Sequence, residues 1–220
     1  EKTSEVNVMQ IEQLKEILKE FGDNVKFNHD LKKKNWFNIG GKSKVFYKAD
    51  NLKSLVNFLK KLNNKEKIFT LGAGSNTLVK DGLFDGVVIK LSKNFNNISL
   101  LGENTIIAGS AVLDKSLSDF AMDNNLSGFE FLSCIPGTIG GGIKMNAGCF
   151  GEEFKDILLS IQVIDKFGTV KSIPSKNISF EYRKSNLSED LIFLSASFRG
   201  IKNDFTKIKK KTNELKSEKE

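Results

Sequence analysis

Apolar residues in the first part of the chain recur first at helical and then at strand-like spacing. Five of them near the N-terminus follow a helical repeat, so residues 7–21 predict an amphipathic helix that ends near Gly22. The pattern then predicts a strand at 45–47, a helix at 52–62 and a buried strand at 68–71. These three elements form a strand, helix, strand unit that leads directly into a glycine-rich segment.

The rest of the chain continues this mixture of helices and strands. Short apolar runs predict further strands at 87–91, 98–101, 105–108, 157–165, 169–173 and 191–198. Residues 112–125 return to helical spacing and predict a helix. Residues 202–220 are rich in lysine, and we expect a basic tail that is helical at best.

Residues 126–151 interrupt the periodic pattern. They hold seven of the 18 glycines and one of the two prolines, and no charged residue lies between Glu130 and Lys144. Because glycine adopts positive φ readily and Pro136 has a fixed φ, we expect tight turns whose N–H groups point outward and bind an anion. Four apolar residues between the turns would lie under a planar ring: Ile135, Ile139, Ile143 and Met145. The alternative is that these glycines only punctuate an ordinary loop.

A second glycine-rich segment follows the strand predicted at 68–71. Its sequence, GAGSN at 72–76, offers backbone N–H groups and a hydroxyl at the end of a strand, where phosphate groups are often bound. It matches neither the dinucleotide fingerprint, because residue 77 is Thr, nor the P-loop, because no Gly-Lys-Ser/Thr follows. The segment therefore predicts phosphate binding without identifying a motif.

Arg183 is the candidate catalytic residue. It lies in the sequence FEYRKS and is one of only two arginines in a chain that otherwise uses lysine for positive charge. Its planar, permanently charged guanidinium suits a carboxylate or a developing enolate. The alternative is a surface ion pair with Glu181 or another nearby acid.

Composition excludes several other functions. The net charge is +7, of which +3 comes from residues 201–220, and no dense basic cluster occurs, so we expect no nucleic-acid partner. Two cysteines, Cys134 and Cys149, and the single histidine fit no disulfide framework and no metal site. We therefore expect a reduced, cytoplasmic protein with no membrane insertion, since no apolar run is long enough to span a membrane.

Three sequences in order, GAGSN, GFEFLSCIPGTIGGGIKMNAG and FEYRKS, resemble the UDP-N-acetylenolpyruvoylglucosamine reductase family. The resemblance implies an α+β fold, the FAD-binding domain of the vanillyl-alcohol oxidase type, with two α+β subdomains at 31–95 and 96–201 and FAD between them. It further implies that NADPH reduces FAD, and that the flavin then reduces a UDP-linked enolpyruvyl sugar to UDP-N-acetylmuramate for peptidoglycan. Arg183 matches the family arginine that stabilises the enolate of the substrate carboxylate together with a glutamate.

The resemblance also assigns cofactor-binding residues. The FAD pyrophosphate would contact Gly72, Ala73, Gly74, Ser75 and Asn76. The pyrophosphate, ribose and flavin would contact Ile135, Pro136, Gly137, Thr138, Ile139, Gly140, Gly141, Met145, Asn146, Ala147 and Gly148. FAD is held non-covalently in the family, so both cysteines are expected to be small buried residues, and a covalent link through Cys149 is the lesser alternative.

The sequence departs from the family pattern in two ways. The resemblance covers residues 31–201, whereas the family continues with a third, substrate-binding domain that supplies the serine acid and the glutamate, and we expect this chain to lack it. With that domain present we would expect a monomer. Cys134 also stands where the family usually has glycine. Two alternatives remain open: a non-catalytic flavin-binding remnant, or a different oxidoreductase on the same FAD domain.

Overall fold

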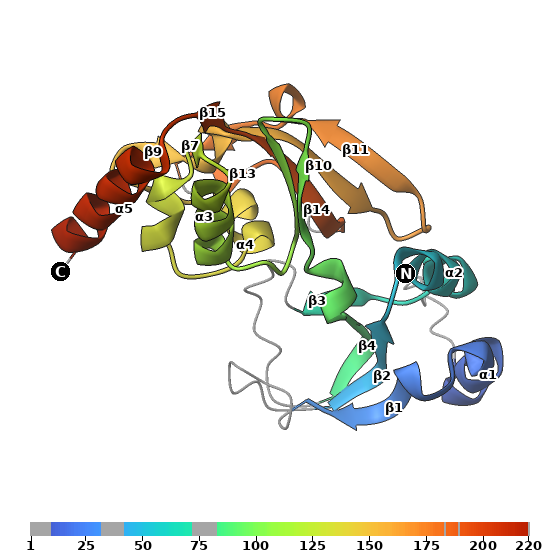
Figure 1. Ribbon diagram of the computed structural model, residues 1–220. Coiled ribbons are helices and arrows are strands. Elements are labelled where there is room, and N and C mark those ends of the chain that lie inside the picture. Colours follow the sequence, from blue (N-terminus) through green and yellow to red (C-terminus); the bar gives the residue numbers. More distant parts are fainter. Residues whose placement is uncertain (1–9, 32–41, 72–82, 183, 189, 220) are drawn as a thin grey trace.

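Two β-sheets, each covered by helices, make up the protein (Figure 1). The computed structural model describes residues 10–31, 42–71 and 83–219, except 183 and 189. A four-stranded sheet has the strand order β1-β2-β4-β3, and a five-stranded sheet has the order β11-β10-β14-β6-β5. The four-stranded sheet lies with α1 and α2, while α3, α4 and α5 gather on one side of the five-stranded sheet (Figure 1).

The four-stranded sheet contains the predicted strand, helix, strand unit. Its elements are β1 (Val25–Asp30), β2 (Lys42–Ala49), α2 (Leu52–Leu62), β3 (Ile68–Leu71) and β4 (Leu83–Leu91). Both β2 and β3 pair with β4 in parallel, and β1 pairs with β2 in antiparallel orientation. The side chain of Asn51 caps α2 by accepting a hydrogen bond from the Ser54 N–H at 2.9 Å. Parallel pairing requires a crossover, which α2 provides.

The N-terminal prediction is only partly correct. The α-helix α1 spans Ile11–Ile17, and a 3₁₀ helix, η1 (Lys19–Asn24), follows it. Gly22 has a φ of 53° inside η1, which is incompatible with a continuing α-helix. The chain then reverses into the edge strand β1; residues 7–9 of the predicted helix lie outside the described residues.

The five-stranded sheet is antiparallel throughout and agrees with the predicted strands. It comprises β5 (Ile98–Leu101), β6 (Thr105–Gly109), β10 (Leu158–Ile164), β11 (Val170–Pro174) and β14 (Ile192–Arg199). Short pairs flank it: β7 (Leu126–Ser127) with β15 (Ile201–Lys202), β8 (Gly148–Cys149) with β9 (Glu152–Glu153), and β12 (Phe180–Glu181) with β13 (Lys184–Ser185). Further 3₁₀ helices are η3 (Lys93–Phe95), η5 (Phe154–Asp156) and η6 (Ser175–Asn177).

Helices on this sheet enclose the larger core. They are α3 (Asp114–Asp123), η4 (Glu130–Cys134), α4 (Ile139–Lys144) and α5 (Phe205–Lys219). The largest buried side chains of this core are aromatic, namely Phe129, Phe131, Phe154 and Phe198. The segment expected to be a basic tail is therefore a docked helix: α5 buries Ile208 and Thr212 and packs against η4.

The two sheets share apolar contacts. Ile164, Ile192 and Leu194 of the five-stranded sheet belong to the same buried cluster as α2 and the four-stranded sheet. The predicted subdomain boundary between residues 95 and 96 stays a prediction. Within the described part of the chain, no helix is both long and apolar enough to cross a membrane.

Candidate functional site

The expectation of outward-pointing amides along residues 126–151 is wrong at 139–142. These residues begin the short helix α4, and their N–H groups are used inside the protein. The Ile139 N–H donates to the Val112 carbonyl at 2.9 Å, and the Gly140 N–H donates to the Ser110 carbonyl at 2.8 Å. Packing requires glycine at position 142, because a Cβ there would lie 2.3 Å from the nearest atom of the Phe154 ring.

The apolar residues of this segment divide between core and surface. Ile139 and Ile143 are fully buried in the core, so their side chains are not available to lie under a planar ring. Ile135 is partly buried, and Met145 is 42% exposed. Of these four side chains, that of Met145 is therefore the most exposed.

Residues 110–114 run beside residues 137–140 and join them through the main chain. Besides the two bonds accepted by Ser110 and Val112, the Asp114 N–H donates to the Gly137 carbonyl at 3.0 Å, and Leu113 forms a β-bridge with Thr138. Gly137 has a φ of 129°, a conformation that favours glycine. The segment expected to bind the cofactor is thus fixed to the start of α3.

Two polar side chains at this junction are buried without hydrogen-bond partners. Asp114 is 1% exposed, as is Ser110, and neither carboxyl oxygen of Asp114 nor the Ser110 hydroxyl has a partner. Burial raises the pKa of the Asp114 carboxyl to about 7. Buried polar groups are nearly always paired, so an unpaired carboxyl beside a candidate binding segment indicates a place for a ligand atom.

A pocket opens at the other end of α4. It has a volume of about 360 Å³, within the usual range for small-molecule sites. Its lining residues are Asn146, Gly148, Cys149, Phe150, Gly151, Glu152, Glu153 and Tyr182. Tyr182, which is 80% exposed, lines the pocket together with two of the residues expected to bind FAD, Asn146 and Gly148.

Asn146 connects this pocket to the strands that flank the candidate catalytic residue. Its side chain is 2% exposed; Nδ2 donates to the Glu181 carbonyl at 3.3 Å, and Oδ1 accepts from the Lys155 N–H at 3.3 Å. A second tie runs from the Ser185 hydroxyl to the Lys144 carbonyl at 2.8 Å. Arg183 lies outside the described residues, but its neighbours on both sides are fastened to the end of α4.

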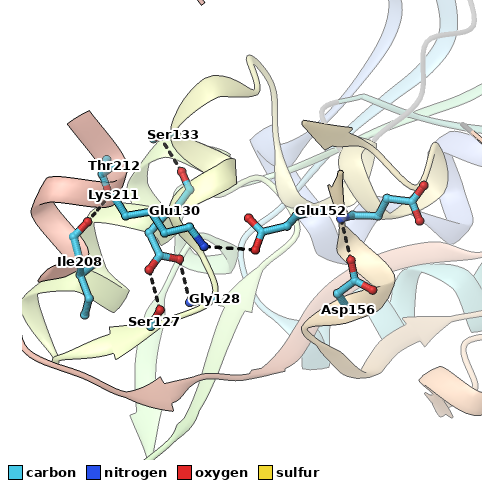
Figure 2. Close-up of polar contacts among 10 residues, drawn as sticks. Ser127, Gly128, Glu130, Ser133, Glu152, Asp156, Ile208, Lys211 and Thr212 are labelled. Carbon is cyan, nitrogen blue, oxygen red and sulfur yellow. Dashed lines mark hydrogen bonds and ion pairs between the residues drawn. The ribbon is translucent and has the colours of Figure 1, made fainter. Parts of the chain in front are cut away.

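Glu130 fixes the turn at the start of residues 126–151 (Figure 2). Its carboxylate is 2% exposed and accepts from the Ser127 hydroxyl at 2.6 Å and from the Gly128 N–H at 2.8 Å. Figure 2 also shows Lys211 of α5 reaching Glu152, a pocket residue, at 3.3 Å. The ion pair between Lys211 and Glu152 joins α5 to the pocket wall.

The two cysteines differ in burial. Cys134 is buried as expected, whereas Cys149 is only partly buried and lines the pocket. Burial is the main cause that raises the pKa of the Cys149 thiol, so the reactive thiolate is disfavoured. Among the described residues no group of three or more His, Cys, Asp or Glu side chains is arranged to hold a metal ion.

The other predicted cofactor segment, Gly72 to Asn76, lies outside the described residues. The strand before it, β3, ends at Leu71 beside the parallel strand β4. Sequence reasoning missed Ser110 and Asp114. An acid at a helix start normally complements the helix dipole, so only the uncharged apolar surroundings, Val112 and Leu117 in particular, could have indicated that Asp114 is buried.

Known proteins provide an independent comparison. A family model described as "FAD binding domain" matches residues 43–173. The chain is 59% identical over 212 residues to the UDP-N-acetylenolpyruvoylglucosamine reductase of Pelagibacter ubique, covering 96% of this chain and 70% of that protein. It is 45% identical over 190 residues to the Rickettsia typhi protein of the same name, covering 86% and 64%.

A solved structure agrees with these relatives. The crystal structure of UDP-N-acetylenolpyruvylglucosamine reductase from Thermus caldophilus matches with a TM-score of 0.71 and 26% identity over 88% of this chain and 68% of that one. The α+β FAD-binding fold inferred from the sequence is confirmed. The chain spans about two thirds of the length of these relatives.

Proposed function

Because the chain belongs to the UDP-N-acetylenolpyruvoylglucosamine reductase family, we propose that it forms the FAD-binding part of an enzyme that reduces UDP-N-acetylglucosamine enolpyruvate with NADPH. The product would be UDP-N-acetylmuramate. We propose a cytoplasmic location because both cysteines are free thiols, as is usual in reducing compartments. We also propose that the complete enzyme acts as a monomer.

The residues at the junction of 110–114 with 137–140 fit a dinucleotide. Ser110 and Asp114 carry buried polar atoms without protein partners, and such atoms are satisfied when a ligand supplies the missing hydrogen bonds. This pair of groups is the observation that carries the proposal within the structure. Residues 135–141 and 145–148 would border the bound FAD, with 72–76 contributing to its pyrophosphate.

Bound FAD would supply hydride transfer between the nicotinamide and the substrate. The role proposed for Arg183 is electrostatic: its fixed charge would stabilise the substrate carboxylate, where negative charge increases in the transition state. The hydrogen bonds of Asn146 and Ser185 would hold the strands on either side of Arg183 at a fixed distance from α4.

The decisive experiment is the visible absorbance spectrum of the purified chain, before and after unfolding and refolding with FAD. We expect a flavin spectrum that bleaches when NADPH is added without oxygen, and more slowly with NADH. Protein that stays colourless after refolding with FAD would contradict the proposal. A flavin spectrum that NADH bleaches as fast as NADPH would contradict only the choice of hydride donor.

The role of Arg183 can be tested on the reduced protein. In an enzyme reconstituted with the substrate-binding domain, adding UDP-N-acetylglucosamine enolpyruvate should restore the flavin colour, and Arg183→Ala should slow that step on the order of 10²- to 10³-fold while leaving reduction by NADPH largely intact. Arg183→Lys keeps the charge but loses the planar guanidinium, and its rate of flavin reoxidation should lie between those of the wild type and Arg183→Ala. An equal loss in both half-reactions would show that Arg183 acts elsewhere.

A further inference from the structure

Asp114 stands apart from the other buried carboxylates of the protein. Its two oxygens have no partner, and the nearer one, Oδ2, lies 3.9 Å from the point where a Cβ on Gly137 would stand. The carboxyl therefore adjoins the main chain of the segment proposed to bind FAD. Ser110 lies four residues before it in the non-helical segment that leads into α3, and its hydroxyl also has no hydrogen-bond partner.

No charged group among the described residues is a cause of the raised pKa of Asp114. Lys115 and Asp119 lie on α3 itself, Glu130 on η4 is engaged with Ser127 and Gly128, and Lys211 on α5 pairs with Glu152. Residues 126–127 and 137–140, which also pack here, contain no titratable group. Burial is the cause that raises the pKa of Asp114 to about 7. The neutral acid is therefore well populated at neutral pH.

A neutral carboxyl and an ionised one act differently toward FAD. The ionised form accepts hydrogen bonds only and would repel the negative charges of the cofactor pyrophosphate. The protonated form has an O–H donor, and an acceptor oxygen of the cofactor would satisfy it. Binding would thus favour the proton on Asp114 more strongly than burial alone.

We propose, on the basis of the function proposed above, that Asp114 binds FAD as a neutral carboxylic acid that donates a hydrogen bond to an oxygen of the cofactor, so that FAD binding takes up a proton. Asp114 is then a cofactor-binding residue beyond those that the sequence motifs indicate. Proton uptake couples the affinity for FAD to pH, because each bound cofactor requires one proton on Asp114.

The test is FAD affinity as a function of pH, measured on the apo-protein by quenching of flavin fluorescence. For the wild type we expect the affinity to fall about tenfold per pH unit above about pH 7, and to be constant near pH 6. Asp114→Asn keeps a neutral donor and should bind FAD with an affinity independent of pH. Asp114→Ala has no donor and should bind weakly at every pH.

Two matched controls isolate the effect. Asp119→Asn makes the same chemical change on the same helix at a residue that is not buried, and should keep the pH dependence of the wild type. His29→Gln removes the single histidine, whose side chain ordinarily titrates near neutral pH, and should also keep it. Loss of the pH dependence in His29→Gln would assign the proton to histidine and overturn the proposal.

Proton uptake by the wild type gives a second readout that needs no variant. Calorimetry in buffers with different ionisation enthalpies should show about one proton taken up per FAD above about pH 7.5. A wild-type affinity that does not vary with pH, or an Asp114→Asn variant that keeps the slope, would overturn the role of Asp114 while leaving FAD binding intact. Absence of FAD binding at every pH would overturn the proposed function as well.

Discussion

Glu130 and Asp114 are two buried carboxyls on helices that pack against each other, and their surroundings are opposite. Glu130 on η4 accepts two hydrogen bonds, at 2.6 and 2.8 Å, from the turn that precedes it. Asp114 at the start of α3 is as deeply buried and accepts none. The carboxylate with partners fixes local structure, whereas the carboxyl without partners reduces stability and is kept where a ligand would meet it.

A similar contrast is found between the two sides of residues 137–148, the segment around α4. On its core side, Gly142 lies against Phe154 and Ile143 is fully buried, so the residue types follow from packing. Its other side borders the pocket and includes two residues with positive φ, Gly137 and Asn146. Proteins store such unfavourable local arrangements where binding relieves them. The contrast gives predictions with opposite signs on the two sides.

The largest effect is expected from Asp114→Asn at alkaline pH. The folded-state pKa of Asp114, about 7, lies above the unfolded value of 3.8, so the folded state binds more protons between these values. The unfolding free energy of the wild type, without FAD, therefore falls as pH rises through this window and levels off above it, by at most about 4 kcal/mol. Asparagine resembles the neutral acid and should remove this loss.

Urea unfolding at several pH values measures this prediction. Asp114→Asn should equal the wild type near pH 4 and exceed it by up to about 4 kcal/mol near pH 8. Asp119→Asn, on the same helix, should follow the wild type at both values. A variant that is less stable than the wild type at alkaline pH would mean that the Asp114 carboxylate has a stabilising partner.

Glu130→Ala should have the opposite sign. It removes the acceptor for the Ser127 hydroxyl and the Gly128 N–H in a buried site, and hydrogen bonds to a charged group contribute more than neutral ones. We expect a loss of about 3 kcal/mol at neutral pH, and a smaller loss for Glu130→Gln, which keeps one acceptor oxygen. Equal stabilities of Glu130→Ala and wild type would remove the contrast between the two carboxyls.

Gly142→Ala tests the core side of the segment. The added methyl group would overlap the Phe154 ring, which is fully buried and packed near Phe131 and Phe198. We expect a loss of about 2 kcal/mol in unfolding free energy. Gly151→Ala is the control: its Cβ would meet no atom within 4 Å, and only its φ of 81° is unfavourable, so about 1 kcal/mol is expected. The reverse ranking would show that backbone strain, not packing, fixes these glycines.

The sequence predicted the regular parts of the fold because local spacing determines them. The strands of the five-stranded sheet and helix α2 follow from period-2 and helical repeats of apolar residues. The docking of α5 was not predictable from its lysines, since only Ile208 and Thr212 are buried and both depend on contact with η4. The early end of α1 depends on the reversal into β1, which is also a tertiary contact.

The candidate site was predicted less completely, for a related reason. Glycine clustering located the segment around α4. It could not show whether a glycine is required because a neighbouring side chain packs against it, as Phe154 does against Gly142, or because a ligand approaches it. Asp114 went unrecognised because burial of a helix-start acid arises from residues distant in sequence, among them Gly137. The assignments of Gly72 to Asn76 and of Arg183 stay predictions.

Asn146→Asp is expected to have a local effect on motion. Aspartate tolerates the φ of 43° and still accepts the bond from Lys155, but it cannot donate to the Glu181 carbonyl. We expect lower stability, because the introduced carboxylate is buried and faces the Glu181 carbonyl, and hydrogen exchange about fivefold faster in the amides of β12 and β13. Asn124→Asp loses a comparable bond, to the Phe120 carbonyl at 2.8 Å, and should leave that exchange unchanged. If both variants accelerated exchange there equally, the effect would be global, and Asn146 would not be the link between α4 and the strands that flank Arg183.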